Sequence, residues 1–311
     1  MGAINNDRFV AKVCEMYYLM DMSQKEIASR LKISRPHICR ILSKARETGI
    51  VEIHIHNTFE SDTRLEHQLM QLYDLKDVFV ATASGNDNEE QFQEFTREAA
   101  SYLDNFLSNG MRIGVMSGKS VSMITRQMKS HGIRLGYIVP LVGGIGMVSP
   151  DLHANSIAMH MSEEYGGTPL VINAPLIASN AEAASFFRRE ASIAAVLEEG
   201  RSSDVAIVGI GNIDENSTTA KAGGISPEDL QALVNAGVVS SVCNSYFDSD
   251  GREVRVLSER TIGLGLNDLK NSRVIACAVG ENKVKAIRSA LLSGYIDVLI
   301  TNSKTAERLI A

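Results

Sequence analysis

Long apolar runs are missing from this sequence of 311 residues. No stretch approaches the ~20 apolar residues that a membrane span needs. The N-terminal segment MGAINNDRF also lacks a basic stretch followed by an apolar core, which a secretion signal would require. We therefore expect a cytoplasmic protein with no membrane partner.

Cysteine is scarce as well. The four cysteines, Cys14, Cys39, Cys243 and Cys277, are far apart and form no Cys-x-x-Cys pair. A zinc ribbon or a disulfide framework needs close or regularly spaced cysteines, so we expect neither, and we expect a reducing compartment. Cys39 is interpreted as a small packing residue.

Complete motifs for nucleotide binding and catalysis are absent from the sequence. Residues 114–120 read GVMSGKS, which resembles a phosphate-binding P-loop but is one residue too short. The Gly-Ile-Gly triplets at 144–146 and 209–211 do not continue to the third glycine of a dinucleotide fingerprint. No serine lies in a Gly-x-Ser-x-Gly elbow. We therefore expect no resident cofactor and no catalytic residues.

What is present is the composition of a globular protein, with 44% hydrophobic and 22% charged residues. The length favours two domains. Residues 1–57 hold nine Lys and Arg against six Asp and Glu, whereas residues 58–311 hold 22 against 31. Residues 25–46 alone carry a net charge of +6. A small basic module on a larger acidic body predicts a polyanion as partner for the first and a smaller ligand for the second.

The basic module has the pattern of three helices. Apolar residues recur at helical spacing over residues 8–18. Ser23 and Glu26 form a capping box that opens a second helix over QKEIASRL. After a turn at residues 32–34, Ser34 caps a third helix that has Pro36 in its first turn and runs to about Arg46.

These dimensions fit a helix-turn-helix, whose second helix lies in the major groove of DNA. Ile38, Ile41 and Leu42 should face inward, which leaves the basic side chains outside. Arg pairs bidentately with guanine, so Arg35 is the candidate for reading sequence. The predicted contacts with double-stranded DNA are Ser23, Gln24, Ser34, Arg35, His37, Arg40 and Lys44.

The segment VEIHIH at residues 51–56 alternates like a strand and predicts the wing of a winged helix. His54 and His56 point to one face of it, a spacing that can bind a metal. No third ligand is nearby, so we interpret them as exposed wing residues and expect no metal site.

The rest of the chain alternates apolar runs with helical stretches. Continuous apolar strands separated by helices predict an α/β fold, a mostly parallel sheet covered by helices on both faces. An amphipathic helix over residues 64–75, with Leu65, Leu69 and Leu72 on one stripe, could join the domains or pair subunits. The predicted strands are at 78–81, 111–116, 137–143, 170–175, 204–211, 274–279 and 298–301.

Ligands of such sheets bind beyond the carboxyl ends of the strands. Four predicted strands end there in small or glycine-rich turns, at residues 117–120, 143–146, 209–211 and 280–283. The turn at 117–120 leads into a helix, whose free N–H groups and dipole would hold an anion. Two of the turns add a lysine, Lys119 and Lys283, so the set predicts a phosphorylated small molecule.

From end to end the chain resembles the SorC family of sugar-responsive bacterial transcription regulators. The matching segments include SQKEIASRLKISRPHICRILSKARETGIV, IGVMSGKSV, PLVGGIG, YFDSDGREV, TIGLGLNDL, AVGENKVKAI and LITNSKTAERLI. The resemblance implies an N-terminal helix-turn-helix domain over residues 1–57. It also implies a sugar-phosphate-isomerase-like effector and oligomerisation domain over residues 58–311, usually as homodimers or homotetramers. The positions that match its ligand pocket are Ser117, Gly118, Lys119, Ser120, Gly143, Gly144, Asn282 and Lys283.

The chain departs from the family pattern at four positions. Some members bind their sugar covalently through a lysine where this chain has Val142. Ser241 replaces an aspartate that often contacts sugar hydroxyls, and is included in the predicted pocket. Lys119 stands where threonine is common, and Val279 replaces a glycine. A ligand different from the well-known ones, or an altered pocket, would follow.

The sequence thus predicts a transcriptional regulator whose affinity for operator DNA is controlled by a phosphorylated sugar. One alternative is a sugar-phosphate isomerase or lyase with a basic appendage, which would need a carboxylate or histidine near the phosphate turns. Another is a DNA-bound structural factor with a vestigial pocket. Sugar phosphates distinguish the three hypotheses. Stabilisation without turnover indicates the regulator, turnover indicates the enzyme, and the absence of any stabilisation indicates the structural factor.

Overall fold

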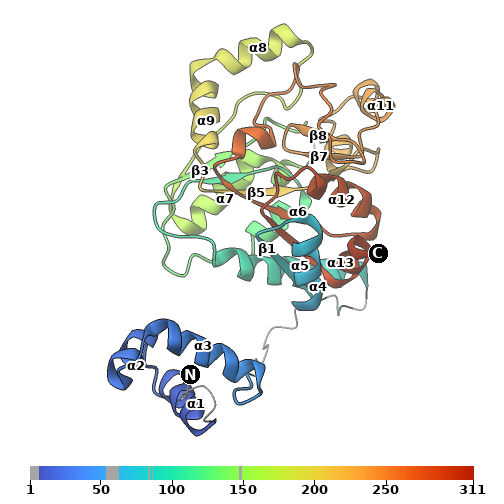
Figure 1. Cartoon of the computed structure of the whole chain (residues 1–311). Coiled ribbons are helices and arrows are strands. Elements are labelled where there is room, and N and C mark those ends of the chain that lie inside the picture. The colour runs from blue at the N-terminus through green and yellow to red at the C-terminus, as the bar shows by residue number, and fades with distance from the viewer. Residues whose placement is uncertain (1–6, 54–62, 83–84, 86, 147–148) are drawn as a thin grey trace. The chain divides into compact units, whose positions relative to one another are not determined.

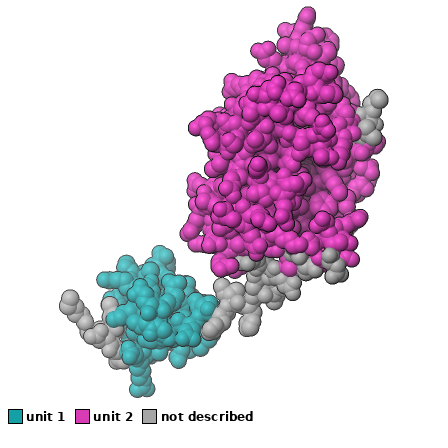
Figure 2. Space-filling model, turned by 90° about the vertical axis from the view of Figure 1, so that its right-hand side faces the viewer, with its two compact units in different colours: residues 1–58 teal, residues 59–311 magenta. Residues whose placement is uncertain are grey.

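A computed structural model describes residues 7–53, 63–82, 85, 87–146 and 149–311. The chain forms two compact units, residues 1–58 and residues 59–311, coloured separately in Figure 2. The predicted domain boundary after residue 57 lies outside the described residues and stays a prediction.

The first unit is helical, as its apolar spacing predicted. It contains α1 (Asp7–Cys14), a π-helical turn (Glu15–Leu19), α2 (Gln24–Leu31) and α3 (Arg35–Glu47). The predicted first helix therefore forms, but its last turn has the wider π geometry. The three helices enclose a small apolar core of Val10, Val13, Cys14, Met16, Ile27, Ile38, Ile41, Leu42 and Ala45.

The predicted helix caps and the predicted wing strand of this unit can be compared with the structure. The capping box is confirmed: the Ser23 backbone N–H donates to Glu26 Oε2 at 2.8 Å, and the Glu26 N–H donates to Ser23 Oγ at 3.3 Å. Ser34 occupies the N-cap position of α3, but its side chain makes no capping hydrogen bond. Residues 51–53 form no strand. Residues 54–56, with His54 and His56, lie outside the described residues, so the wing stays a prediction.

The second unit is built on a seven-stranded sheet in the order β1-β10-β9-β5-β2-β3-β4 (Figure 1). Every neighbouring pair in it is parallel, which confirms the predicted fold class. Its strands are β1 (Asp77–Ala81), β2 (Ile113–Val115), β3 (Tyr137–Pro140), β4 (Thr168–Pro169), β5 (Val205–Gly209), β9 (Arg273–Cys277) and β10 (Val298–Asn302).

Successive residues of a strand point to opposite faces of the sheet. Both faces of this sheet are apolar, and helices cover both of them. Ala206 and Val208 of β5 pack into one apolar cluster, whereas Val205 and Ile207 pack into the other. One face is covered by α4 (Thr63–Tyr73), α9 (Ala191–Arg201), α12 (Val284–Leu292) and α13 (Ser303–Ile310), while α8 (Ala181–Arg189) packs on α9. The other is covered by α5 (Asn88–Asp104), α6 (Lys119–Thr125) and α7 (Ala154–Tyr165).

The strand order reverses between β2 and β5, which are neighbours. From β2 the chain continues to β3 on one side, and from β5 it continues to β9 on the other. The turns that follow these two strands therefore diverge. A crevice at such a reversal point is where open α/β sheets bind ligands.

The predicted strand at residues 170–175 is wrong. The pairing with β3 is made by Thr168 and Pro169 just before it. Beyond them, the Asn155 side chain of α7 accepts from the Ile172 N–H and donates to the Ile172 carbonyl, each at 3.0 Å. Asn155 thus takes the place of a strand partner at Ile172 alone. The ends of the segment have backbone partners, since the Leu170 N–H donates to the Ile138 carbonyl and the Ala174 carbonyl accepts from the Gly144 N–H, each at 2.9 Å.

Two further differences concern the surroundings of the sheet. Leu65 and Leu69 of α4 are buried as predicted, but Leu72 is 55% exposed and does not belong to the buried stripe. A small antiparallel sheet of β6 (Gly211–Asn212), β7 (Ser240–Val242) and β8 (Ser245–Phe247) was not predicted. Between its first two strands lie α10 (Thr218–Lys221) and α11 (Pro227–Asn235).

Phe95 of α5 offers a test of the core, since its ring is fully buried under the sheet. We expect Phe95→Ala to lower the free energy of unfolding by about 3 to 5 kcal/mol, because the lost burial adds to the cost of a cavity. Urea unfolding followed by circular dichroism measures it. Phe186→Ala, at a ring that is 58% exposed on α8, is the matched control and should change stability by about 0.5 kcal/mol or less. Equal effects of the two variants would contradict this packing.

Candidate nucleic-acid interface and ligand pocket

The exposed side of α3 is the candidate nucleic-acid interface. Ile38, Ile41 and Leu42 are buried against the other helices, whereas Arg35 and Arg40 are exposed. Ser23 at the start of α2 and Ser34 at the start of α3 are exposed too. The remaining predicted contacts, Gln24, His37 and Lys44, are partly buried.

Two residues of α3 differ from expectation. His37 lies at the border of the buried side, and its Nε2 atom is buried with no hydrogen-bond partner among the described residues. Cys39, interpreted from the sequence as a packing residue, is exposed. It follows Arg35 by four positions and precedes Ser43 by four, so it lies on the same side of the helix as both.

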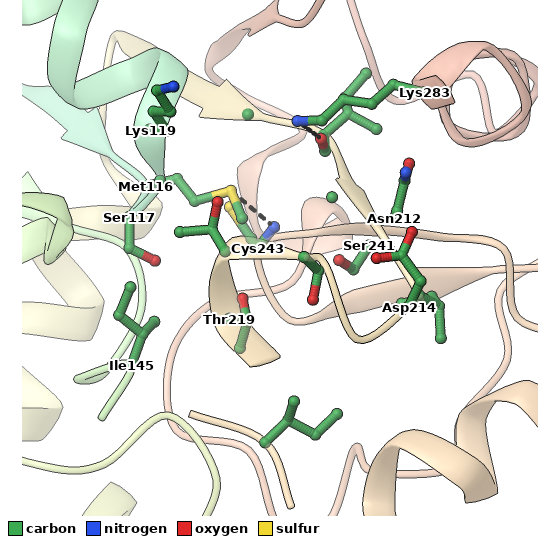
Figure 3. Close-up of a pocket in the computed structure, with 18 of the residues that line it drawn as sticks. Met116, Ser117, Lys119, Ile145, Asn212, Asp214, Thr219, Ser241, Cys243 and Lys283 are labelled. Carbon is green, nitrogen blue, oxygen red and sulfur yellow. Dashed lines mark hydrogen bonds between the residues drawn. The ribbon is translucent and has the colours of Figure 1, made fainter. Parts of the chain in front are cut away.

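A cavity of about 130 Å³ lies beyond the carboxyl ends of β2 and β5, at the reversal point of the strand order (Figure 3). Four elements surround it: the turns after β2, β5 and β9, and the small antiparallel sheet. Of the predicted pocket residues, the structure brings together Ser117, Gly118, Lys119, Ser120, Ser241, Asn282 and Lys283.

The turn after β2 presents the start of α6 to the cavity. Gly118 is its N-cap with a φ of 141°, a conformation that side chains rarely adopt. The first N–H groups of α6 have no partner within the helix. The Lys119 Nζ lies 4.8 Å from the centre of the Phe92 ring, a cation–π contact that holds this side chain at the rim.

Lys283 contributes a second ammonium group from the turn after β9. Its Nζ donates to the Ile210 carbonyl at 3.1 Å, in the turn after β5 (Figure 3). Burial lowers the pKa of Lys283 below its ordinary value, and the charge of Lys119 lowers it further, while the Asp214 carboxylate raises it. This amine therefore carries a positive charge that is poorly hydrated and only partly compensated.

Asn212 connects the same two turns. Its Nδ2 donates to the Asn282 carbonyl at 3.1 Å, while its Oδ1 is buried with no hydrogen-bond partner among the described residues. An unpaired buried acceptor is costly, so this atom is ready to accept from a ligand hydroxyl.

Gly143 and Gly144 are not among the residues that line the cavity; their neighbours Val142 and Ile145 are. A Cβ on Gly143 would lie 2.5 Å from the Pro175 carbonyl oxygen. Gly143 is thus required because two backbone segments pack closely there, and this spacing explains it without a ligand, whereas a Cβ on Gly144 would meet no atom closer than 3.7 Å.

Several lining residues were missed from the sequence: Asn212, Asp214, Thr219, Cys243 and Tyr246. Asn212 and Asp214 directly follow the glycine-rich turn at 209–211, so their polarity after a strand end was a usable signal. The others come from α10, from the turn between β7 and β8, and from β8, which tertiary pairing alone brings to this place.

A second, more open cavity of about 720 Å³ adjoins the first and shares Lys119 and Asn282 with it. It lies at the starts of α5 and α13. Among the described residues, no group of three or more His, Cys, Asp or Glu side chains is arranged to hold a metal ion. No helix in the described part of the chain has the length and apolar character that crossing a membrane requires.

Known protein families and relatives match nearly the whole chain. The family described as "Putative sugar-binding domain" matches residues 57–311, and the family described as "Sigma-70, region 4" matches residues 11–48. The "Sorbitol operon regulator" of Klebsiella pneumoniae is 31% identical over 316 residues, covering 97% of this chain and 98% of the relative. The "Deoxyribonucleoside regulator" of Bacillus subtilis (strain 168) is 28% identical over 301 residues, covering 96% of each.

The fold is similar over the same extent. The crystal structure of the full-length sorbitol operon regulator SorC from Klebsiella pneumoniae aligns with a TM-score of 0.74 at 29% identity, over 99% of this chain and all of that one.

The environments of the cysteines predict their reactivity. Burial raises the pKa of Cys14, and raises those of Cys243 and Cys277 to about 12, whereas Cys39 is exposed. Because the thiolate is the reactive form, we expect one fast-reacting thiol per native chain with a disulfide reagent at pH 8, and four in denaturant. Cys39→Ser should abolish the fast phase. Two or more fast thiols in the native chain would contradict the described burial.

Proposed function

This chain belongs to the SorC family of transcriptional regulators, which combine a helix-turn-helix with a sugar-binding domain, and we propose that a phosphorylated sugar in its pocket controls its binding to operator DNA. The regulator would act in the cytoplasm, where bacterial DNA and phosphorylated sugars are found together. The observation that carries the proposal is the convergence of Lys119 and Lys283 on a cavity that also contains the start of α6.

The lysines and the helix start support a phosphate group as the anchor. Lys283 is a partly buried cation whose pKa is lowered by burial, so an incoming dianion would replace the hydration that this amine lacks. The unpaired N–H groups at the start of α6 add donors, and the helix dipole favours negative charge there. Gly118 leaves open space, since a Cβ built on it meets no atom within 4 Å.

The rest of the lining supports a polyhydroxylated ligand. Asn212 offers an unpaired buried Oδ1, and Asp214, Thr219 and Ser241 add acceptors or donors around the same hollow (Figure 3). Apolar contacts come from Val142, Ile145, Leu176 and Tyr246 on other sides. A sugar phosphate combines the charge, the hydroxyl groups and the apolar C–H faces that such a lining can bind.

Control of DNA binding requires that the ligand binds two arrangements of the protein with different affinity. Coupling free energies of this kind are about 1 to 3 kcal/mol. We propose a homodimer or homotetramer, in which paired α3 helices about 34 Å apart read a pseudo-palindromic operator.

The ligand proposal is tested by thermal melting with a panel of sugar phosphates and the matching free sugars. A phosphorylated ligand should raise the melting temperature without being consumed, because it binds the folded state selectively. Lys283→Met should weaken binding by about 1.5 to 3 kcal/mol, the usual range for a charged hydrogen bond. Lys285→Met, at an exposed lysine of α12, is the matched control and should behave like wild type.

The same assay has a predicted pH dependence. A phosphate ester stays dianionic above its second pKa of about 6, so its charge is constant in alkaline solution. Affinity should therefore fall as the pH rises through the lowered pKa of Lys283, before the ordinary lysine value of about 10.4 is reached. Lys283→Met should lose this fall. Turnover of a sugar phosphate would instead favour an enzyme, and equal stabilisation by free sugars would contradict a phosphate anchor.

Arg35 offers the test of DNA reading. We expect Arg35→Ala to relax the preference at one operator base pair, at a cost of about 1 to 3 kcal/mol, because a bidentate contact with guanine is lost. Fluorescence anisotropy with a set of single-base operator variants measures it. Arg46→Ala, at an exposed arginine near the end of α3, is the control. Uniformly weaker binding of Arg35→Ala to every variant would show that Arg35 contacts phosphate instead.

A further inference from the structure

Three helices of the second unit meet at one backbone oxygen, the carbonyl of Leu309 near the end of α13. The Tyr73 hydroxyl, from the end of α4, donates to it at 2.9 Å. The Arg288 guanidinium, from α12, donates to the same oxygen at 3.4 Å and to the Arg308 carbonyl at 3.0 Å. Leu309 is 1% exposed, so these donors satisfy a carbonyl group within the packed interior.

One of these helices starts at the pocket. α12 begins at Val284, directly after Asn282 and Lys283. Arg288 lies five residues beyond Lys283 on this short rigid segment, a rise of about 7 to 8 Å. A displacement of the turn that carries Lys283 would therefore move Arg288 by a similar distance.

The second helix is attached to the same turn at its other end. The Gly280 N–H donates to Thr305 Oγ1 at 3.0 Å, and the Thr305 N–H donates to the Asn302 cap of α13 at 3.0 Å. Thr305 is buried, which protects this connection from water. The pocket turn at residues 280–283 thus contacts α13 at its start directly and at its end through Arg288.

The third helix, α4, follows the DNA-binding unit in the chain, after residues 54–62. Leu65 and Leu69 of α4 pack in the same apolar cluster as Leu309. The N–H of Val80 in β1 donates to Glu66 of α4 at 3.0 Å. α4 is therefore the first described element after the segment that leads to the DNA-binding unit, and a displacement of α4 would move the end of that segment.

The geometry points to the Leu309 carbonyl as the junction that couples occupancy of the pocket to α4, with Tyr73 as the positioning residue on the α4 side. The inference rests on the proposed function, since it needs an anion at Lys283. A carbonyl oxygen has two lone pairs and can accept from both donors. The bond from Tyr73 has an ordinary length, whereas that from Arg288 lies beyond the usual 2.7–3.2 Å range. A shift of α12 by a few tenths of an ångström would make or break this weaker bond, and in the proposed coupling the junction would alternate between these two arrangements.

Amide hydrogen exchange of the full chain, with inorganic phosphate as the probe and sodium chloride at equal ionic strength as the reference, tests the junction. In the wild-type protein, phosphate should slow exchange by about threefold or more both in residues 280–284 and in residues 66–75 of α4 and its end. Tyr73→Phe removes a single hydroxyl. It should keep the slowing at residues 280–284 and lose it in residues 66–75.

Matched variants separate this coupling from general packing. Arg288→Met keeps the aliphatic stem, removes both hydrogen bonds of Nη2 and should give the same loss as Tyr73→Phe. Tyr137→Phe, at a tyrosine of β3 that is 37% exposed, should leave both effects unchanged. Slowing at residues 280–284 without slowing in α4 of the wild type, or full retention of the α4 effect in Tyr73→Phe, overturns the junction alone. The absence of any slowing at residues 280–284 overturns the proposed phosphate anchor, and the junction with it.

Discussion

The parallel pairing of β2 with β5 is the constraint from which the pocket follows. Ile113, Gly114 and Val115 pair with residues 205–207, although 89 residues of chain separate the two strands. Gly114 has no side chain, which leaves room for Leu141 on this face of the sheet: a Cβ there would lie 2.7 Å from Leu141 Cδ2. Since the chain leaves the two strands in opposite directions, the turns beyond them diverge, and their backbone and side chains border a hollow.

Much of this fold could be predicted because the strands of a covered parallel sheet are apolar along their whole length. The segments at 78–81, 204–211 and 298–301 contain little but apolar residues and glycine, and all three form strands. The small antiparallel sheet could not be predicted in the same way. Its strands are two or three residues long and rich in serine, and their pairing depends on contacts between distant segments. The segment at 170–175 was apolar enough for a strand, but at its middle the side chain of Asn155 satisfies the backbone groups of Ile172 instead of a neighbouring strand.

A site residue could be predicted where a polar or charged side chain directly follows the end of a predicted strand. Lys119 and Lys283 follow strand ends in glycine-rich turns, and both line the cavity. Gly143 is different, because a glycine after a strand can serve either a ligand or a neighbouring backbone, and here Pro175 occupies the space. Cys39 shows the same ambiguity on α3. Small uncharged residues fit either side of a helix, and helix phase alone does not distinguish the border of a buried stripe from its exterior.

The segregation of charge along the chain fits the two partners of the proposed function, which are DNA and a small anion. In the proposed function, the acidic second unit, with 31 Asp and Glu against 22 Lys and Arg over residues 58–311, would repel the phosphate backbone of DNA. This repulsion would favour contact through the basic residues of α2 and α3. A small anion must overcome the same repulsion, and it can do so where Lys119 and Lys283 reverse the local sign. Burial already disfavours the charged form of Lys283. An anion beside this amine would stabilise the charged form by electrostatic attraction, whereas a neutral sugar would not. In the proposed function, the desolvated lysine would thus make the otherwise repulsive second unit selective for a negatively charged ligand.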